Sequence, residues 1–86
     1  MINENDTIEN EVITIFAQHF GVDTESVNIS DNFREVFDAD SLDEIELLVD
    51  MEDHFNIEIN NEEAEAILTV GDAINCVRIY VEKNYV

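Results

Sequence analysis

Basic residues, cysteine and proline are almost missing from this chain of 86 residues. Only three residues are Lys or Arg, against 22 Asp and Glu, and the formal net charge is -19. This balance excludes ordinary nucleic-acid binding, which needs cations against phosphate, and it argues against anionic membrane surfaces. It favours partner proteins with basic surface patches, because long-range attraction speeds their encounter. A purely solubilising role is the simpler alternative, but solubility needs a much smaller net charge.

A single cysteine, Cys76, excludes an internal disulfide bond and a cysteine-based metal site. No apolar run is long enough to span a membrane, and the first residues lack the basic region and apolar stretch of a signal peptide. We expect a cytoplasmic protein, a monomer, with no membrane partner. No proline, repeat or low-complexity linker divides the chain, so we predict one domain over residues 1–86, with residues 1–5 frayed.

Apolar residues at helical spacing predict a first long helix. Asp6 and Glu9 have the spacing of a capping box, so this helix should begin near Thr7, and Gly21 is placed to end it. Residues 21–40 follow without a sustained period, and so long a connection is often functional. The apolar residues expected to pin this connection to the core are Val22, Val27, Ile29, Phe33, Val36 and Phe37. The last three of them predict one helical turn within it.

Three further helices are predicted after the long connection. The second long helix should cover residues 41–55, with Ser41 and Glu44 as another capping-box pattern. A short helix is expected over residues 62–67, and a capping pattern at Thr69 opens the last long helix. The fold class is therefore expected to be all-α: a small antiparallel four-helix bundle of three longer helices and one short one, with a long first loop.

The helix predicted over residues 41–55 has two apolar arcs at ~100° per residue. The core arc, which should face the interior, consists of Leu47, Leu48, Met51 and Phe55. The second arc consists of Leu42, Ile45 and Val49, bordered by Glu46, Asp50, Glu52 and Asp53. Small exposed apolar patches with charged borders often mark binding sites. The simpler alternative is that neighbouring helices bury both arcs.

Ser41 opens this helix at the end of the long connection, and its simplest role is an N-cap. Nucleophilic catalysis would require an adjacent base. His54 lies roughly 20 Å farther along the helix at ~1.5 Å per residue, and we interpret His19 as a partly buried packing residue of the first helix. No Gly-rich nucleophile turn surrounds Ser41, and residues 38–49 lack the ligand pattern of a calcium loop. We therefore predict neither catalytic residues nor a dedicated metal site.

The run Asp38-Ala39-Asp40-Ser41-Leu42-Asp43 resembles the attachment motif of acyl carrier proteins. Segments of the same family match in order around it: 33–37 before the motif, and 46–47, 52–55, 57–59, 62–65 and 69–73 after it. The resemblance covers the chain from residue 7 to residue 80 without gaps. A lone Asp-Ser-Leu would be weak evidence, whereas the ordered set, with this length and acidity, is specific.

The resemblance implies that a phosphopantetheinyl transferase, a holo-carrier synthase, uses coenzyme A and Mg²⁺ to attach 4'-phosphopantetheine to the Ser41 hydroxyl. The terminal thiol of that arm would carry acyl chains as thioesters, which retreat between the helices. The protein itself would be no enzyme, and would dock on basic patches of acyl-transfer and fatty-acid synthesis enzymes. The docking residues implied by the resemblance are Asp40, Leu42, Asp43, Ile45, Glu46, Val49, Glu52 and Asp53.

Two positions depart from the family pattern. Asp38 stands where the family usually has Gly, and Asn60 stands where Pro is common. Asp tolerates left-handed backbone angles better than most residues, so neither departure removes the attachment chemistry. A carrier for a polyketide or another specialised acyl pathway stays an alternative to the fatty-acid carrier. A different alternative is an unmodified acidic interaction protein, which would need the acids and the second arc but not the Ser41 hydroxyl.

Overall fold

Three long helices dominate the chain, which a computed structural model describes over residues 4–84, with the side chains of residues 7–83. The helices are α1 (Glu4–Phe20), the 3₁₀ turn η1 (Thr24–Ser26), α2 (Phe33–Val36), α3 (Ser41–Phe55), α4 (Asn61–Ala66) and α5 (Val70–Asn84). Within residues 4–84 there is no β-strand, only an isolated bridge between Asn32 and Thr69. The all-α prediction is confirmed, including the three longer helices, the short helix and the single turn inside the long connection.

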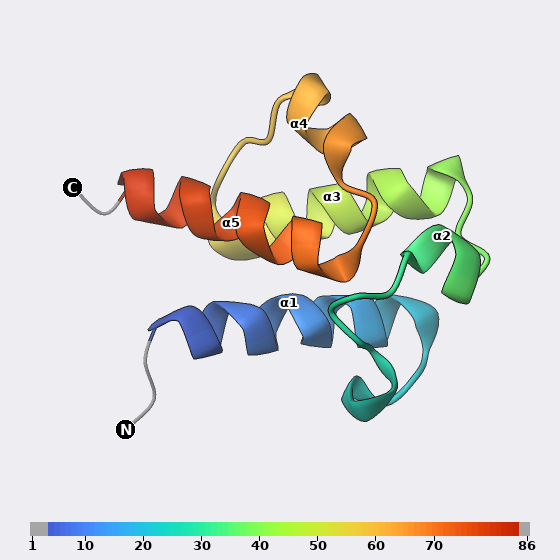
Figure 1. Cartoon of the computed structure of the whole chain (residues 1–86). Helices are drawn as coiled ribbons and strands as arrows, with labels where there is room; N and C mark the ends of the chain where they lie inside the picture. The colour runs from blue at the N-terminus through green and yellow to red at the C-terminus, as the bar shows by residue number, and fades with distance from the viewer. Residues whose placement is uncertain (1–3, 85–86) are drawn as a thin grey trace.

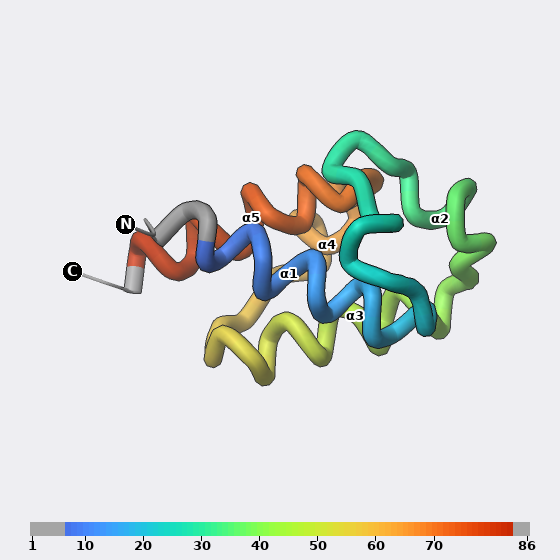
Figure 2. Tube along the Cα trace, turned by 90° about the horizontal axis from the view of Figure 1, so that it is seen from below, coloured from blue at the N-terminus to red at the C-terminus, as the bar shows by residue number. Residues whose placement is uncertain are grey.

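The long helices run in two directions. α1 is antiparallel to α3 and α5, and these two run in the same direction because the segment containing α4 carries the chain back along the bundle (Figure 1). α1 lies between α3 and α5 in Figure 2 and packs against both. α2 lies at the end of the bundle where α3 begins (Figure 1), so the long connection delivers the chain directly to Ser41.

The first helix ends as predicted but begins earlier. Gly21 takes a left-handed φ of 68° and closes α1, a conformation that glycine adopts without a steric penalty. At the other end, α1 already includes Glu4, whereas the capping-box pattern placed its start near Thr7. Acidic residues are favourable throughout the first turn of a helix, so the pattern did not exclude an earlier start. The side chain of Asp6, the expected cap, lies outside the described side chains.

The last long helix begins at the predicted cap. The Thr69 hydroxyl oxygen accepts the Asp72 N–H at 3.0 Å, and the Asp72 carboxylate accepts the N–H groups of Leu68 and Thr69 at 3.1 Å each. These backbone hydrogen bonds favour the charged carboxylate, and they lower the pKa of Asp72. The reciprocal contacts determine where α5 begins.

The core is built by apolar faces of the three long helices together with parts of the connections. Its most deeply buried large side chains are Val12, Phe16, Leu47, Val70 and Val77. Of the loop residues predicted to face the core, four do so: Val22, Val27, Phe33 and Phe37. Ile29 and Val36 are 51% and 53% exposed, so the prediction is wrong for them. The connection uses the backbone of Ile29, whose carbonyl accepts the Gly71 N–H at 2.7 Å, and Val36 lies on the solvent side of the one-turn α2.

Aromatic contacts hold α2 against the end of α1. The ring of Phe33 lies edge-to-face on Phe16 with centroids 5.2 Å apart, and the ring of Phe37 stacks on Phe20 at 4.6 Å. Such pairs add about 0.5–1.5 kcal/mol beyond their burial. They position the residues immediately before α3.

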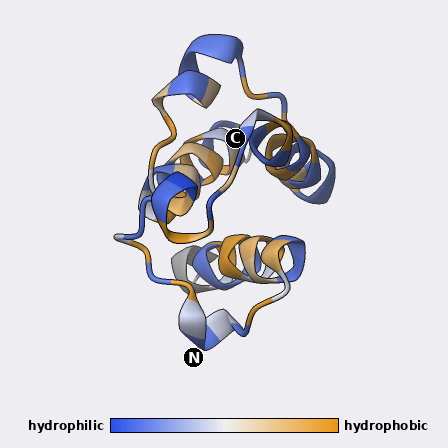
Figure 3. Cartoon of the chain, turned by 90° about the vertical axis from the view of Figure 1, so that its right-hand side faces the viewer, coloured by the Kyte–Doolittle hydropathy of each residue, from blue (hydrophilic) through white to orange (hydrophobic). Residues whose placement is uncertain are grey.

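The short helix α4 has no buried residue and is mostly hydrophilic (Figure 3), although Ala64 packs against the core. Polar contacts also hold this helix. The Asn60 side-chain oxygen accepts the Glu63 N–H at 2.8 Å, so Asn60, which departs from the family pattern, acts as the N-cap. The Glu63 carboxylate accepts a hydrogen bond from the Tyr80 hydroxyl of α5. That bond is the main reason why the pKa of Tyr80 is raised. α4 is therefore tied to α5 through one carboxylate.

Candidate functional site

The residue that caps α3 is Asp40, not Ser41. Its Oδ1 accepts the Asp43 N–H at 3.0 Å, and Asp43 Oδ2 accepts the Asp40 N–H at 3.1 Å, which completes a reciprocal capping box. The predicted Ser41–Glu44 box is therefore wrong, because an equally good cap stands one residue earlier and Glu44 instead pairs with Arg34. Ser41 becomes the first helical residue, and its exposed hydroxyl makes no hydrogen bond to any described side chain.

The backbone just before the cap passes through a left-handed residue. Asp38 has a φ of 54°, in the region where glycine is normally preferred. The family's usual glycine at this position thus has a conformational reason, and Asp is among the few residues that take its place at small energetic cost. The turn brings the chain from α2 to the start of α3.

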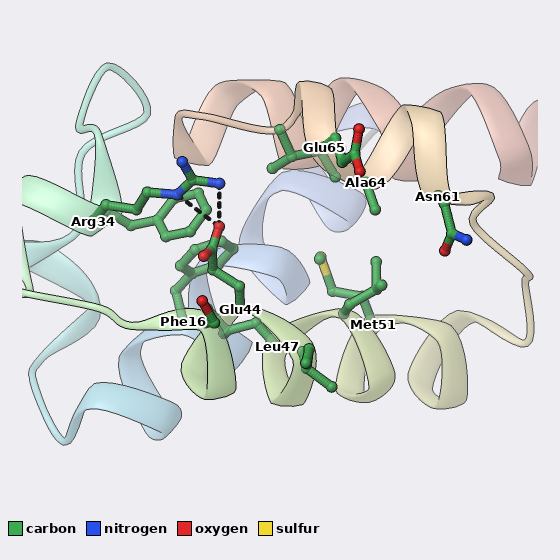
Figure 4. A pocket seen from close by; sticks show the side chains of 13 residues that line it. Phe16, Arg34, Glu44, Leu47, Met51, Asn61, Ala64 and Glu65 are labelled. Carbon is green, nitrogen blue, oxygen red and sulfur yellow. Dashed lines mark hydrogen bonds and ion pairs between the residues drawn. The ribbon is translucent and has the colours of Figure 1, made fainter.

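Ser41 lines a cavity of about 440 Å³ between α3, α4 and the α2 region (Figure 4). The apolar wall of this cavity consists of Phe16, Phe33, Ile45, Leu47, Leu48, Met51, Ala64 and Ile67. Cavities of about 300–1,000 Å³ with apolar walls and few polar groups are typical of small-molecule sites. The structure therefore places a free hydroxyl beside a space suited to an apolar chain.

An ion pair also lines this cavity. Arg34 Nε donates a hydrogen bond to Glu44 Oε1 at 2.6 Å, and the guanidinium forms an ion pair with the same carboxylate (Figure 4). Glu44 follows Ser41 by three residues on α3, so the pair and the hydroxyl lie on neighbouring turns. The periodicity of the sequence could not indicate this contact, because Arg34 belongs to the irregular connection.

The two apolar arcs of α3 have the predicted environments. The second arc is exposed, with Leu42 at 62%, Ile45 at 56% and Val49 at 46%. In the core arc, Leu47 and Met51 are each 2% exposed. The remaining members of the core arc, Leu48 and Phe55, are partly buried against the core. An exposed apolar patch therefore starts one residue after Ser41.

The acidic residues implied as docking contacts do not share one environment. Asp40, Glu46 and Asp53 are exposed, although Asp40 also caps the helix. Glu52 is partly buried, and its Oε2 accepts the N–H of Ile59 at 2.9 Å. Glu52 thus fixes the extended stretch after α3, a role that the sequence pattern did not reveal.

His19, which we expected only to pack within the first helix, also lies next to the site. Its side chain is 14% exposed and edge-to-face with Phe20, as a packing residue would be, but its Nε2 lies 2.9 Å from Asp43 Oδ1. The hydrogen bond with His19 is the main cause that lowers the pKa of Asp43, followed by the Asp40 backbone N–H. The other histidine, His54, pairs with Glu11 at 3.1 Å.

Comparisons with known proteins match this arrangement. A family model described as the phosphopantetheine attachment site matches residues 10–77. The chain is 41% identical over 71 residues to the acyl carrier protein of Lactobacillus acidophilus, covering 83% of this chain and 89% of that protein. It is 40% identical over 72 residues to the acyl carrier protein of Chlamydia caviae, covering 84% and 94%. The chain belongs to the acyl carrier protein family.

The fold of this carrier matches the family as well. A solved structure of the acyl carrier protein from Enterococcus faecalis superposes with a TM-score of 0.75 at 30% identity, covering 88% of this chain and 96% of the other. The attachment domain implies a covalent 4'-phosphopantetheine. The residues at the start of α3 fit such a group, because the Ser41 hydroxyl is exposed and the positive end of the helix dipole favours a nearby phosphate.

Proposed function

We propose that this carrier holds 4'-phosphopantetheine on Ser41 and serves fatty-acid synthesis. The observation that carries the assignment is the position of Ser41 at the first residue of α3, beside the apolar cavity. Its hydroxyl is exposed and has no hydrogen bond to any described side chain. Ser26 and Ser30 are exposed too, but they lie in the connection before α3 and do not line this cavity. When attached, the arm supplies the thiol on which acyl groups are carried as thioesters.

The chain's own residues would shelter the cargo. Leu47 and Met51 form part of an apolar wall that begins next to Ser41, so an acyl chain entering the cavity would leave water. Each buried methylene group contributes about 0.8 kcal/mol to such a transfer. Ile45 both lines the cavity and stands exposed on α3, so it lies where a cargo and a partner surface would meet.

We propose that α3 presents a docking face to partner enzymes. This docking face consists of Leu42, Ile45 and Val49 with the exposed acids Asp40, Glu46 and Asp53. Acids around an apolar patch suit basic surfaces, where charge speeds the encounter and the apolar side chains supply the contact. The partners would be the phosphopantetheinyl transferase and acyl-transfer and fatty-acid synthesis enzymes with basic patches. The net charge of -19 likewise favours partners with basic surfaces.

We propose that the carrier has no catalytic activity of its own. Both histidines are paired with carboxylates, His19 with Asp43 and His54 with Glu11, so neither stands as a base beside Ser41. None of the helices within residues 4–84 combines the length and the apolar character needed to cross a bilayer. A cytoplasmic location is part of the same proposal, and the free, buried thiol of Cys76 is compatible with a reducing compartment.

Intact-mass measurement tests the attachment site. Wild type, Ser41→Ala and the matched control Ser30→Ala are each incubated with coenzyme A, Mg²⁺ and a broad-specificity phosphopantetheinyl transferase. Wild type and Ser30→Ala should gain the mass of one arm, and Ser41→Ala should gain nothing. An arm on Ser41→Ala would refute the site. A wild type that is never modified would leave the unmodified acidic interaction protein as the better function.

A second measurement tests the pathway. The modified carrier is offered to a reconstituted fatty-acid synthesis system, and the acyl chains that it accumulates are identified by mass spectrometry. Stepwise growth by two-carbon units supports the fatty-acid assignment. Loading without elongation would favour the carrier of a specialised acyl pathway.

A further inference from the structure

One imidazole and two carboxylates from different helices converge close to Ser41. His19 is the second-last residue of α1, and Asp43 and Glu46 are three residues apart on α3, so both carboxylates share a helix face. One potential ligand atom from each of the three lies within 4.8 Å of the others. The described residues include many acids, yet this is the one group of three His, Cys, Asp or Glu side chains among them that meets that spacing.

We propose that His19, Asp43 and Glu46 form a binding site for Zn²⁺. One imidazole nitrogen and two carboxylate oxygens are a mixed donor set that suits zinc, whereas Mg²⁺ and Ca²⁺ prefer oxygen alone. Three protein ligands leave a fourth tetrahedral position for water or an exchangeable ligand. The site therefore differs in kind from loose binding of divalent cations over the acidic surface.

The geometry requires little rearrangement. Zinc bonds of about 2.0–2.2 Å place neighbouring tetrahedral donors roughly 3.3 Å apart. His19 Nε2 and Asp43 Oδ1 already lie 2.9 Å apart, so the ion would enter between them in place of their hydrogen bond. Only the Glu46 carboxylate has to move closer to these two atoms. Its side chain is exposed and makes no hydrogen bond or ion pair with any described residue, so a change of rotamer is sufficient.

Two of the ligands are held in place by other contacts. The second oxygen of Asp43 accepts the Asp40 N–H at 3.1 Å, which directs Oδ1 toward α1. The ring of His19 is packed edge-to-face on Phe20 with centroids 4.8 Å apart. Ligands oriented in this way lose less conformational entropy when a metal binds.

The electrostatic surroundings favour a cation. His19 also lines a polar cleft of about 470 Å³ between α1 and α3, together with Asp50 and Asp53. These carboxylates, and a net charge of -19 over the chain, raise the local concentration of cations. A bound ion would pin the end of α1 to the first turns of α3, two residues from Ser41. Binding itself does not depend on the proposed carrier function.

Titration calorimetry with Zn²⁺ tests the site on the full chain. Millimolar Mg²⁺ is present throughout to occupy loose acidic sites. The matched variants are His19→Gln and His54→Gln, because His54 is paired with one carboxylate, that of Glu11, and belongs to no cluster of three. Wild type and His54→Gln should bind one Zn²⁺ with equal affinity, and His19→Gln should bind at least about tenfold more weakly. Circular dichroism verifies that each variant is folded.

A second variant and a second metal keep the test decisive. Glu46→Gln removes a ligand that makes no hydrogen bond or ion pair with any described residue, so it should weaken Zn²⁺ binding without affecting the fold, even if His19→Gln does not fold. Co²⁺, added in place of Zn²⁺, should give visible absorption bands of low-coordinate geometry in wild type. Equal affinities in wild type and Glu46→Gln, binding lost in His54→Gln, or no saturable Zn²⁺ binding in the presence of Mg²⁺ would each overturn the proposal.

Discussion

Asp40 and Asp43 exchange two hydrogen bonds across the first turn of α3, and this exchange leaves the Ser41 hydroxyl without a hydrogen bond to any side chain of residues 7–83. A serine that capped its own helix would use one lone pair of its oxygen to accept a backbone N–H, and modification of that oxygen would disturb the cap. Here the capping is done by the neighbours, so modification of Ser41 need not destabilise the helix.

Replacement of the serine should therefore change stability much less than replacement of the cap. We expect Ser41→Ala to alter the free energy of unfolding by less than about 0.5 kcal/mol, because Ala is a better helix former and no bond is lost. Asp40→Ala should lower it by about 0.5–2 kcal/mol. Urea denaturation followed by circular dichroism measures both. A larger loss in Ser41→Ala than in Asp40→Ala would contradict this assignment of the cap.

The two arcs of α3 should separate folding from binding. Leu47→Ala removes a side chain that is 2% exposed, and it should lower the free energy of unfolding by about 2–5 kcal/mol. Ile45→Ala removes one that is 56% exposed, so stability should change little while affinity for the transferase falls. Thermal denaturation and surface plasmon resonance give the two readouts. The arcs are wrongly assigned if Ile45→Ala unfolds the protein and Leu47→Ala does not.

Charge reversal on the docking face should slow association. We expect Glu46→Lys and Asp53→Lys to reduce the association rate constant with a basic partner enzyme and to weaken its dependence on salt. The matched control is Glu58→Lys, an equal change of charge at an exposed position after the end of α3. Stopped-flow measurements at several salt concentrations separate the effects. If Glu58→Lys slows association as much, only net charge matters and the docking face is not specific.

The cap of α5 should make stability depend on acid pH. The folded pKa of Asp72 lies below its unfolded value of about 3.9, because backbone N–H groups stabilise the carboxylate. Its contribution is therefore fully present above the unfolded pKa and is lost as pH falls through the lower folded pKa. Asp72→Asn should be less stable than wild type at pH 6, and the difference should shrink below about pH 4. A difference that stays constant from pH 6 to pH 3 would contradict the role of the charge.

Much of this fold could be predicted because its determinants lie within a few residues of one another. The bounds of α3, the turn at residues 33–36 and the cap at Thr69 follow from spacings of three and four, which the backbone of a helix brings together directly. The same spacing separated the exposed Leu42 from the buried Leu47. The attachment motif could be recognised for the same reason, since its residues are contiguous.

Only the tertiary structure decided which polar groups meet. His19 and Asp43 are 24 residues apart, and they come into contact because α1 packs against α3. Glu44 pairs with Arg34 instead of capping its helix, because the irregular connection places a guanidinium within its reach. Ile29 is exposed because the connection contributes its carbonyl rather than its side chain to the contact with α5. Periodicity reports which face of an element is apolar, whereas the partner across that face depends on how whole elements pack.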